Sequence, residues 1–513
     1  MDQAAGLLSG VQVVELAQRI SGPYCGKILA HLGAEVIKVE PPEGDEVRRL
    51  GPFPGHRPHP ETSGLFLWLN ANKYGVTLDL TVSEDRRRLR NLVQGADVLI
   101  ESDAWGLDNT GLADLNPGLV RTSITPFGNW GPYAEFKATD LVLYHMSGNA
   151  HGLLGPVVDP DREPPIRAGG HQAELVVGMA AATATLSALY RKQMTGVGCQ
   201  VHISAFEAMV NQLISGLANC AYGQSAPTRD LRQVQEDAIG GMVGAIGGVL
   251  PCHDGYVAIS PREDAQWARW LEVMGNPAWA SDERYATREA RQRNVSELWV
   301  LLGQWSRQYA KHDIARWGQE QRIPCFPVNT VQDLLKDEHL AARQFFVDLD
   351  HPVAGHLAYP GVPYQLLHTT LPLKARPAPL LGQHNDMVLD RQRAALSRPT
   401  PGSRKPPNPA IHHLPLAGVR VLDFSWIIAG PTATRFLAMM GAEVIKVGST
   451  RRPDPSSRGA PFQAYNQSKL SATLNITKPQ GLALAKQLMA ISDVVIENFA
   501  AGVIERLGLG YEV

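Results

Sequence analysis

Two segments of this 513-residue chain repeat each other. SGPYCGKILAHLGAEVIKVE begins at Ser21 and returns as AGPTATRFLAMMGAEVIKVG from Ala429, at a constant offset of 408 residues. Two later pairs follow in the same order at an offset of 396 residues: NANKYGVTLDL (70–80) with NQSKLSATLNI (466–476), and ADVLIE (96–101) with SDVVIE (492–497). An ordered repeat of this length predicts that one folding unit begins twice in the chain.

The repeated unit has the pattern of a parallel α/β fold. An apolar, β-branched run at 11–16 predicts a buried strand. Ile28, Leu29 and Leu32 then follow at helical spacing, Gly33 is a helix stop, and 35–40 is a second strand. Strand, helix and strand in this order favour a parallel sheet. The fold class predicted is therefore α/β, with a Rossmann-like large domain.

Composition along the chain predicts the domain boundaries. The large domain is expected to use both ends of the first unit, around a smaller α+β domain in the middle that carries a glycine-rich stretch. Residues 391–415 are rich in proline and basic residues, as in a linker. The predicted ranges are 8–205 and 341–390 for the large domain, 206–340 for the small domain, 391–415 for the linker and 416–513 for a partial second copy.

Bulk properties exclude several classes of function. A net charge of −2 gives no basic surface for nucleic acid. The five cysteines are widely spaced and contain no CxxC pair, which favours a reduced, cytoplasmic chain without a zinc site. The first residues lack the pattern of a signal peptide. The most apolar run, 175–190, is interpreted as a buried helix, too short to span a bilayer, so no membrane partner is expected.

Several stretches together resemble one known family, the family III CoA-transferases, which includes formyl-CoA transferase, carnitine CoA-transferase and alpha-methylacyl-CoA racemases. The stretches occur in the family's order over about residues 8–389: LSGVQVVEL, SGPYCGKILAHLGAEVIKVEPPEGDEVR, NANKYGVTLDL, GADVLIE, LNPGLVRTSITPFGNWGPY, RKQMTGVGCQVHIS, DGYVAI, RIPCFPV and APLLGQHND. The second copy resembles the first quarter of such a unit. The chain thus resembles a tandem fusion of two family units, the second cut short.

The resemblance implies how the chain folds, assembles and reacts. In the family two units interlock like chain links, so a homodimer or an intramolecular pseudo-dimer is expected. The implied reaction transfers CoA from an acyl-CoA to a carboxylic acid through a carboxylate nucleophile and an enzyme–CoA thioester. CoA and acyl-CoA are expected as substrates, with no permanently bound cofactor and no metal.

The resemblance assigns the nucleophile to Glu174, where the family has aspartate. Glutamate offers the same chemistry with a reach one methylene longer. Without the resemblance, Glu174 would be interpreted as an acidic residue that complements the start of a helix. Two other functions stay open. A racemase of the same fold is disfavoured because Thr139 occupies the position of the family's histidine, and a catalytically inactive CoA-binding half remains the third alternative.

CoA binding is assigned unevenly to the two copies. After the strand at 96–101 the first copy has Ser102, Asp103 and, further on, Asn109 where the family has asparagine, phenylalanine and arginine. The second copy retains all three. The CoA-binding residues implied by the resemblance are Lys73, Lys469, Asn498, Phe499 and Arg506. Without it, either lysine would be interpreted as a solvated surface charge. Gly244, Gly247 and Gly248 resemble the family's glycine loop, which would serve as a mobile lid.

Overall fold

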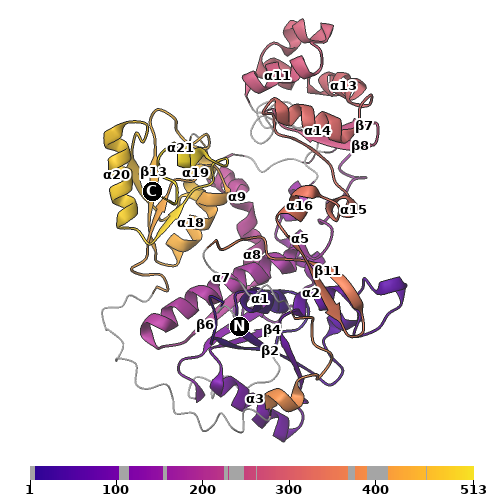
Figure 1. Ribbon diagram of the computed structural model, residues 1–513, viewed down its shortest axis with the longest axis vertical. Helices are drawn as coiled ribbons and strands as arrows, with labels where there is room; N and C mark the ends of the chain where they lie inside the picture. The colour runs from indigo at the N-terminus through magenta and orange to yellow at the C-terminus, as the bar shows by residue number, and fades with distance from the viewer. Residues whose placement is uncertain are drawn as a thin grey trace. The chain divides into compact units, whose positions relative to one another are not determined.

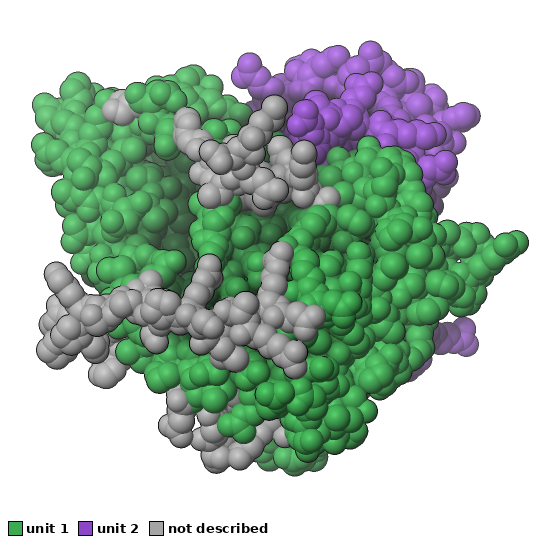
Figure 2. Space-filling model, turned by 60° about the horizontal axis from the view of Figure 1, so that its bottom comes forward, with its two compact units in different colours: residues 1–153, 165–226, 346–513 green, residues 154–164, 227–345 purple. Residues whose placement is uncertain are grey.

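The computed structural model describes residues 6–102, 115–153, 157, 159–224, 229, 248–261, 263–367, 376–389, 414–457 and 459–512. The chain forms two compact units, coloured separately in Figure 2. Unit 1 comprises residues 1–153, 165–226 and 346–513, and unit 2 comprises 154–164 and 227–345. Asp103 and Asn109, Gly244 and Gly247, and almost the whole predicted linker lie outside the described residues.

Unit 1 contains a six-stranded sheet in which every neighbouring pair is parallel, in the order β3-β2-β1-β4-β5-β6. The strands form where the sequence predicts them, because their β-branched side chains are buried among helices on both faces. The bounds are β1 Gln12–Glu15, β2 Glu35–Glu40, β3 Tyr74–Thr77, β4 Val98–Ser102, β5 Val120–Thr125 and β6 Cys199–Ser204. The order reverses between β1 and β4, which makes their carboxyl ends a switch point.

Helices cover both faces of this sheet (Figure 1). The helices in this part of the chain are α1 Ser21–His31, α2 Gly64–Asn70, α3 Ser83–Gly95, α5 Asp140–Met146, α6 Asn149–Gly152, α7 Gln172–Thr195, α8 Ala205–Val210 and α9 Ile214–Ala221. Two short 3-10 helices, Glu46–Arg49 and Pro54–His56, lie between β2 and α2.

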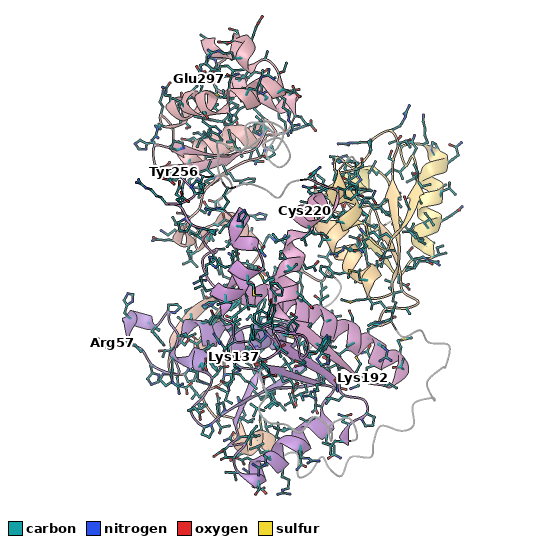
Figure 3. The ribbon with its side chains drawn as sticks, turned by 180° about the vertical axis from the view of Figure 1, so that it is seen from behind. Arg57, Lys137, Lys192, Cys220, Tyr256 and Glu297 are labelled. Carbon is teal, nitrogen blue, oxygen red and sulfur yellow. The ribbon has the colours of Figure 1, made fainter. Side chains whose placement is uncertain are left out.

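The long helix α7 belongs to the core of unit 1. Its 24 residues are enough, by length and composition, to cross a membrane, so the expectation of a run too short to span was wrong. Its alanine-rich face is buried against α1 and the sheet, as in a core helix. The helix ends at Gly196, whose φ of 77° forms a left-handed cap. Near that end Lys192, labelled in Figure 3, forms an ion pair of 2.6 Å with Asp97.

A second parallel sheet of unit 1 has the order β14-β13-β12-β15. Its strands are β12 Arg420–Asp423, β13 Glu443–Gly448, β14 Leu470–Thr473 and β15 Val494–Ile496, and its helices are α18 Ala429–Met439, α19 Ala460–Tyr465, α20 Pro479–Ala490 and α21 Val503–Arg506. Arg420 pairs with Glu443 as Gln12 pairs with Glu35, so the register repeats at the 408-residue offset. Among the described residues β15 pairs with β12 alone.

A late segment of unit 1 returns to the edge of the first sheet. It contains the hairpin of β10 (Phe346–His351) and β11 (Gly355–Pro360). Beyond it, His384 Nδ1 accepts a hydrogen bond of 3.1 Å from the backbone of Gly75, and Asn385 Oδ1 accepts one of 2.8 Å from Thr77. The GQHND stretch therefore continues the hydrogen bonding of β3, an edge strand.

Unit 2 has its own core, built from a three-stranded antiparallel sheet and helices rich in tryptophan. The elements are β7 Gly248–Cys252, β8 Gly255–Ile259, α11 Asp264–Val273, α12 Arg288–Arg293, α13 Val295–Ser306, α14 Lys311–Glu320, β9 Cys325–Pro327, α15 Val331–Leu334 and α16 Glu338–Ala342, with 3-10 helices Ala278–Ser281 and Glu283–Tyr285. A side chain at Gly248 would collide with the ring of Trp299, so this glycine permits close packing.

Candidate active site

The loop after β1 is held rigidly at the switch point of the first sheet. Ser102 Oγ accepts a hydrogen bond of 3.0 Å from the backbone N–H of Gln18. The next residue, Arg19, has a φ of 69°, and its N–H donates to Asp45 Oδ1 at 3.1 Å. A positive φ is unfavourable for arginine. The hydrogen bond to the Asp45 carboxylate therefore supports a backbone conformation that is unfavourable for arginine.

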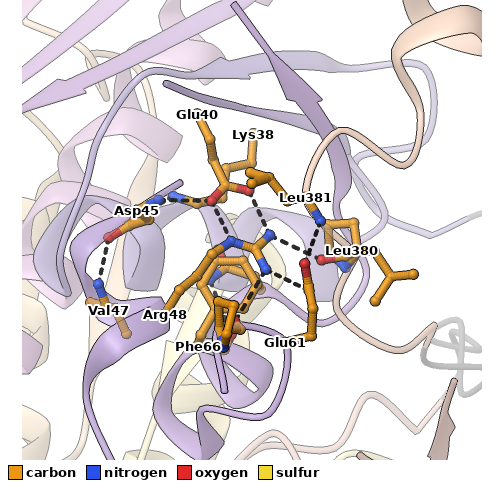
Figure 4. A network of polar contacts seen from close by, with 12 residues as sticks. Lys38, Glu40, Asp45, Val47, Arg48, Glu61, Phe66, Leu380 and Leu381 are labelled. Carbon is orange, nitrogen blue, oxygen red and sulfur yellow. Dashed lines mark hydrogen bonds and ion pairs between the residues drawn. The ribbon is translucent and has the colours of Figure 1, made fainter. Parts of the chain in front are cut away.

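Asp45 is fixed in turn by a buried ion cluster (Figure 4). Lys38 Nζ lies 2.7 Å from Asp45 Oδ2 and 3.3 Å from Glu15 Oε1, and all three side chains are buried. Burial alone would lower the pKa of Lys38, but the charges of Asp45 and Glu15 outweigh it and the pKa is raised. The ammonium therefore stays charged and keeps both carboxylates satisfied.

An arginine joins this cluster to the neighbouring segments. Arg48 pairs with Glu40 at 2.7 Å and with Glu61 at 2.7 Å, and its guanidinium lies 3.7 Å from the ring centre of Phe66. Glu61 also accepts a hydrogen bond from the backbone of Leu381, in the returning segment. Two distant parts of the chain are thereby tied to the base of the switch point.

The two lysines predicted to bind CoA lie in matching buried positions. Lys73 Nζ donates to Glu15 Oε2 at 2.8 Å, to the carbonyl of Pro23 at 2.7 Å and to Asn70 Oδ1 at 2.9 Å. In the second sheet Lys469 makes the equivalent three hydrogen bonds, to Asp423, Pro431 and Asn466, at 3.0, 2.9 and 2.9 Å. The interpretation as solvated surface charges was wrong. Contact with CoA stays a prediction, since each ammonium already uses its three donors.

Burial shapes the titration of both lysines. It lowers the pKa of Lys73 to about 8, against the opposing charge of Glu15, and it lowers the pKa of Lys469, against that of Asp423. In each site the neighbouring carboxylate favours the charged form of the lysine and opposes the effect of burial.

Helix α7 brings Glu174 to the same switch point. The N–H groups of Ala173 and Glu174 donate to Asp140 Oδ1 at 3.0 and 3.3 Å, and Arg167 Nη1 lies 3.0 Å from Asp140 Oδ2. Asp140, the first residue of α5, therefore caps α7 from a different helix. One turn further on, Gly178 allows the backbone of Ser21 to approach closely, since a Cβ there would lie 2.7 Å from the Ser21 oxygen.

The Glu174 carboxylate is enclosed but not tightly bound. Its side chain is 13% exposed, and no hydrogen bond from the described residues reaches either oxygen. Arg19 Nε lies 3.9 Å from Oε1, and His171 Nδ1 lies 3.6 Å from Oε2. Burial raises the pKa of Glu174 to about 7, which Arg19 opposes and the charge of Asp140 supports. Near neutral pH a large fraction of this side chain is an anion with unoccupied oxygen lone pairs.

At the switch point of the second sheet, Asn498 performs the task of Ser102. Its Oδ1 accepts from the N–H of Trp426 at 2.8 Å, and its Nδ2 donates to the Trp426 oxygen at 2.9 Å. The ring of Phe499 meets Trp426 edge-on, with centroids 5.4 Å apart, and the guanidinium of Arg452 lies 5.3 Å from the Trp426 ring centre. Arg506, in α21, is exposed, and no hydrogen bond described here joins it to Asn498 or Phe499.

The sequence did not predict three residues that contact or support the site. Arg19, Asp140 and Trp426 were not among the predicted site residues. One signal could have identified Arg19. At the 408-residue offset it aligns with Ile427, so the two copies differ there in charge. Within the described ranges no cluster of three or more His, Cys, Asp or Glu side chains suited to a metal ion occurs. Of the predicted glycine loop, Gly248 is described, as the first residue of β7.

Comparison with known proteins agrees on one family. The family model "CoA-transferase family III" matches residues 8–385 and again 416–513. The chain is 31% identical over 400 residues to succinate–glutarate CoA-transferase of Agrobacterium fabrum, covering 74% of this chain and 94% of that protein. It is 30% identical over 402 residues to formyl-CoA:oxalate CoA-transferase of Streptomyces avermitilis, again covering 74% and 94%.

Two further relatives bear on length and on fold. "Probable CoA-transferase Rv1866" of Mycobacterium tuberculosis is 31% identical over 511 residues, which is 95% of this chain but 60% of the relative's length. A solved CAIB/BAIF family protein from Brucella suis superposes with a TM-score of 0.66 at 31% identity, over 76% of this chain and all of that one.

Proposed function

Because the chain belongs to family III of the CoA-transferases, we propose that it transfers CoA from an acyl-CoA to a carboxylic acid with Glu174 as the nucleophile. The observation that carries the proposal is the Glu174 carboxylate itself. It lies largely buried at the switch point of a parallel sheet, beside a guanidinium, with its oxygens unoccupied by hydrogen bonds from the described residues. Such a carboxylate is little screened by water and is ready to attack.

The steps balance without redox chemistry or net consumption of water. A Glu174 oxygen attacks the thioester carbonyl, the C–S bond breaks, and CoA thiolate leaves a mixed anhydride. The thiolate attacks the Glu174 carbonyl, which releases the first acid and leaves a Glu174–CoA thioester. The second acid's carboxylate attacks that thioester and expels CoA thiolate, giving a new anhydride. The thiolate then attacks the acyl carbonyl, forms the new acyl-CoA and regenerates the Glu174 carboxylate.

The alternatives receive less support. A racemase needs an acid–base pair at an α-carbon, and Thr139 occupies the position where the family's racemases have histidine. An inactive CoA-binding half would have no need of a carboxylate that is costly to bury. Relatives named for succinyl-CoA and formyl-CoA reactions suggest the first donors to test.

The decisive experiment is mass spectrometry of the purified protein after mixing with a panel of acyl-CoAs, with hydroxylamine trapping. A thioester or hydroxamate on the peptide that contains Glu174, absent from Glu174→Gln, is the expected result. No adduct with any donor, from protein that binds CoA, would contradict the assignment of Glu174.

For CoA binding we propose the second sheet's switch point, with Phe499 and Arg506 contacting the nucleotide and Asn498 holding the loop. An aromatic surface and cations beside it suit a phosphorylated adenosine. Phe499→Ala and Arg506→Ala should each weaken CoA binding about 10-fold by calorimetry, whereas Arg316→Ala, on the exposed face of α14, should leave it unchanged. The glycine stretch at 244–248 is proposed as a lid.

We also propose that residues 416–513 form a second, Rossmann-like family unit fused in tandem to the first. The second family match, the repeated register and the matching lysine sites support this. We further propose that the enzyme is cytoplasmic and that it forms either a homodimer or an intramolecular pseudo-dimer. Light scattering after gel filtration distinguishes the two assemblies.

A further inference from the structure

Arg19 places a cation with unused donors beside Glu174. Its Nε lies 3.9 Å from the Glu174 carboxylate, which is too long for a hydrogen bond. The side chain is 47% exposed, and within the described residues its guanidinium donates no hydrogen bond to the protein. A guanidinium carries five N–H donors in a planar fork that matches a carboxylate. The site therefore presents an anion-binding group directly at the proposed reacting atom.

The position of Arg19 is built rather than incidental. Its backbone is fixed by Asp45 in a left-handed conformation, and Asp45 is held by the buried Lys38. The preceding residue, Gln18, is clamped by Ser102. The backbone around Arg19 is thus hydrogen-bonded to the buried ion cluster on one side and to the end of strand β4 on the other.

The second sheet shows that this loop does not need a cation. Ile427 stands at the equivalent position with a φ of 66°, and its N–H donates to Asp454 Oδ2 at 3.0 Å. The preceding residue, Trp426, is clamped by Asn498. Because isoleucine occupies the same conformation with the same support, the charge of Arg19 serves something other than the fold of the loop.

We propose that Arg19 binds the carboxylate of the acid that exchanges CoA with Glu174 and holds it against the reacting carbonyl. This inference rests on the proposed function. In the resting enzyme Arg19 faces the Glu174 anion. Once Glu174 is converted into a neutral CoA thioester, the guanidinium loses its counter-charge and attracts the incoming acid at the stage when the acid must attack.

The chemistry distinguishes a carboxylate from the phosphates of CoA. Glu174 has to meet the thioester carbonyl, and the pantetheine arm separates that end of the cofactor from its phosphates. A cation 3.9 Å from Glu174 is therefore next to the reacting end. In the step itself, an oxygen of the bound acid forms a C–O bond to the Glu174 carbonyl carbon, the C–S bond breaks, and CoA thiolate leaves. Arg19 keeps its proton throughout and positions the acid.

The test separates loading of the enzyme from its discharge. Wild-type protein, Arg19→Ile, Arg19→Lys and the control Arg316→Ile are loaded with the same acyl-CoA, and the Glu174–CoA thioester is quantified by mass. The loaded proteins are then mixed with increasing concentrations of the acid released during loading, which must discharge them by microscopic reversibility. All measurements are made at pH 9, above the pKa of about 7 of Glu174, because the charges of Arg19 and Asp140 influence that pKa; His171 also faces the carboxylate.

With acyl-CoA in excess we expect Arg19→Ile to load completely, although more slowly, because the released acid leaves through the same site. It should then need about 10- to 100-fold more acid for half-maximal discharge, the cost of a lost charge-assisted pair. Arg19→Lys should show a smaller shift, and Arg316→Ile none. Equal melting temperatures establish that the variants fold. If Arg19→Ile needs the same acid concentration as the wild type for discharge, this inference is overturned and the proposed function stands. The same holds if the variant changes only the acyl-CoA concentration needed for loading. Failure of the wild type to load would overturn both.

Discussion

The charge state of one enclosed side chain, Glu174, sets the pH range in which the proposed reaction can run. Burial raises its pKa to about 7, while Arg19 opposes the shift and Asp140 supports it; His171 also faces the carboxylate. Only the ionised form is nucleophilic. We therefore expect kcat/KM for the acyl-CoA to rise with pH through an apparent pKa near 7 and then to level off. A profile flat from pH 5 to 9 would contradict this environment.

The same pKa predicts an effect on stability. The folded-state pKa of about 7 lies above the ordinary glutamate value of 4.5, so folding favours the protonated form of Glu174 and is opposed by its ionisation. Stability is lost as pH rises from about 4.5 through 7, by at most about 3 kcal/mol. Glu174→Gln should therefore exceed the wild type in free energy of unfolding at pH 8.5 and match it at pH 4.5, measured by urea denaturation. The same difference in free energy of unfolding between variant and wild type at both pH values would contradict the prediction.

Lys38 is the residue on which the buried ion cluster depends. Replacing it with methionine preserves volume but leaves Asp45 and Glu15 without their shared cation. Removing one partner from a buried ion pair costs about 3–5 kcal/mol. We expect Lys38→Met to lower the free energy of unfolding of unit 1 by that amount. The comparison variant Arg87→Met, which loses an exposed pair with Glu84, should change it by less than about 1 kcal/mol.

Among the secondary-structure elements, helix α7 depends on a cap supplied from outside itself. Asp140 Oδ1 accepts hydrogen bonds from two N–H groups in the first turn of α7. The charge of Asp140 also raises the pKa of Glu174. Asp140→Asn keeps an oxygen acceptor but removes the charge. The apparent pKa of the pH–rate profile should therefore move downward, while Asp140→Ala should also lose about 1 kcal/mol of stability. An upward shift in Asp140→Asn would contradict this account.

The elements were more predictable than the contacts that join them. Runs such as EVIKVE, with β-branched residues between polar ends, located strands to within a residue or two, because their burial depends on local pattern. The role of Asn498 and Ser102 could not be predicted in this way. Both side chains accept a hydrogen bond from the backbone of a loop that is distant in sequence, so serine in the first copy keeps the loop contact that asparagine makes in the second.

For the molecule as a whole, the two compact units give distinct spectroscopic signals. Unit 2 contains six of the ten tryptophans, packed in a core of its own: Trp267, Trp270, Trp279, Trp299, Trp305 and Trp317. Separate cores favour separate unfolding transitions. Tryptophan fluorescence, which reports mainly unit 2, and far-UV circular dichroism should therefore give different urea midpoints. Lys38→Met should lower the midpoint of unit 1 and leave the fluorescence midpoint unchanged; coincident shifts would contradict independent units.

Sequence also predicted the pairing of distant segments unevenly. The repeat predicted two similar sheets because both copies retain the motif residues. It did not predict that Arg19 would lie beside Glu174, since 155 positions separate them. The contact depends on the positive φ of Arg19 and on the close approach of helix α7 to Ser21 at Gly178. Tertiary contacts of this kind follow from three-dimensional packing rather than from spacing.

The margin of the second sheet has a practical consequence. Strand β4 pairs with β5 on its outer side, whereas its counterpart β15 pairs with β12 alone among the described residues and exposes Val494 and Val495. An apolar strand with unpaired backbone groups is a template for adding another strand. A protein of these 513 residues alone is therefore expected to form edge-to-edge polymers as its concentration rises. Val495→Lys, which places a charge on the open edge, should keep the light scattering of concentrated samples low.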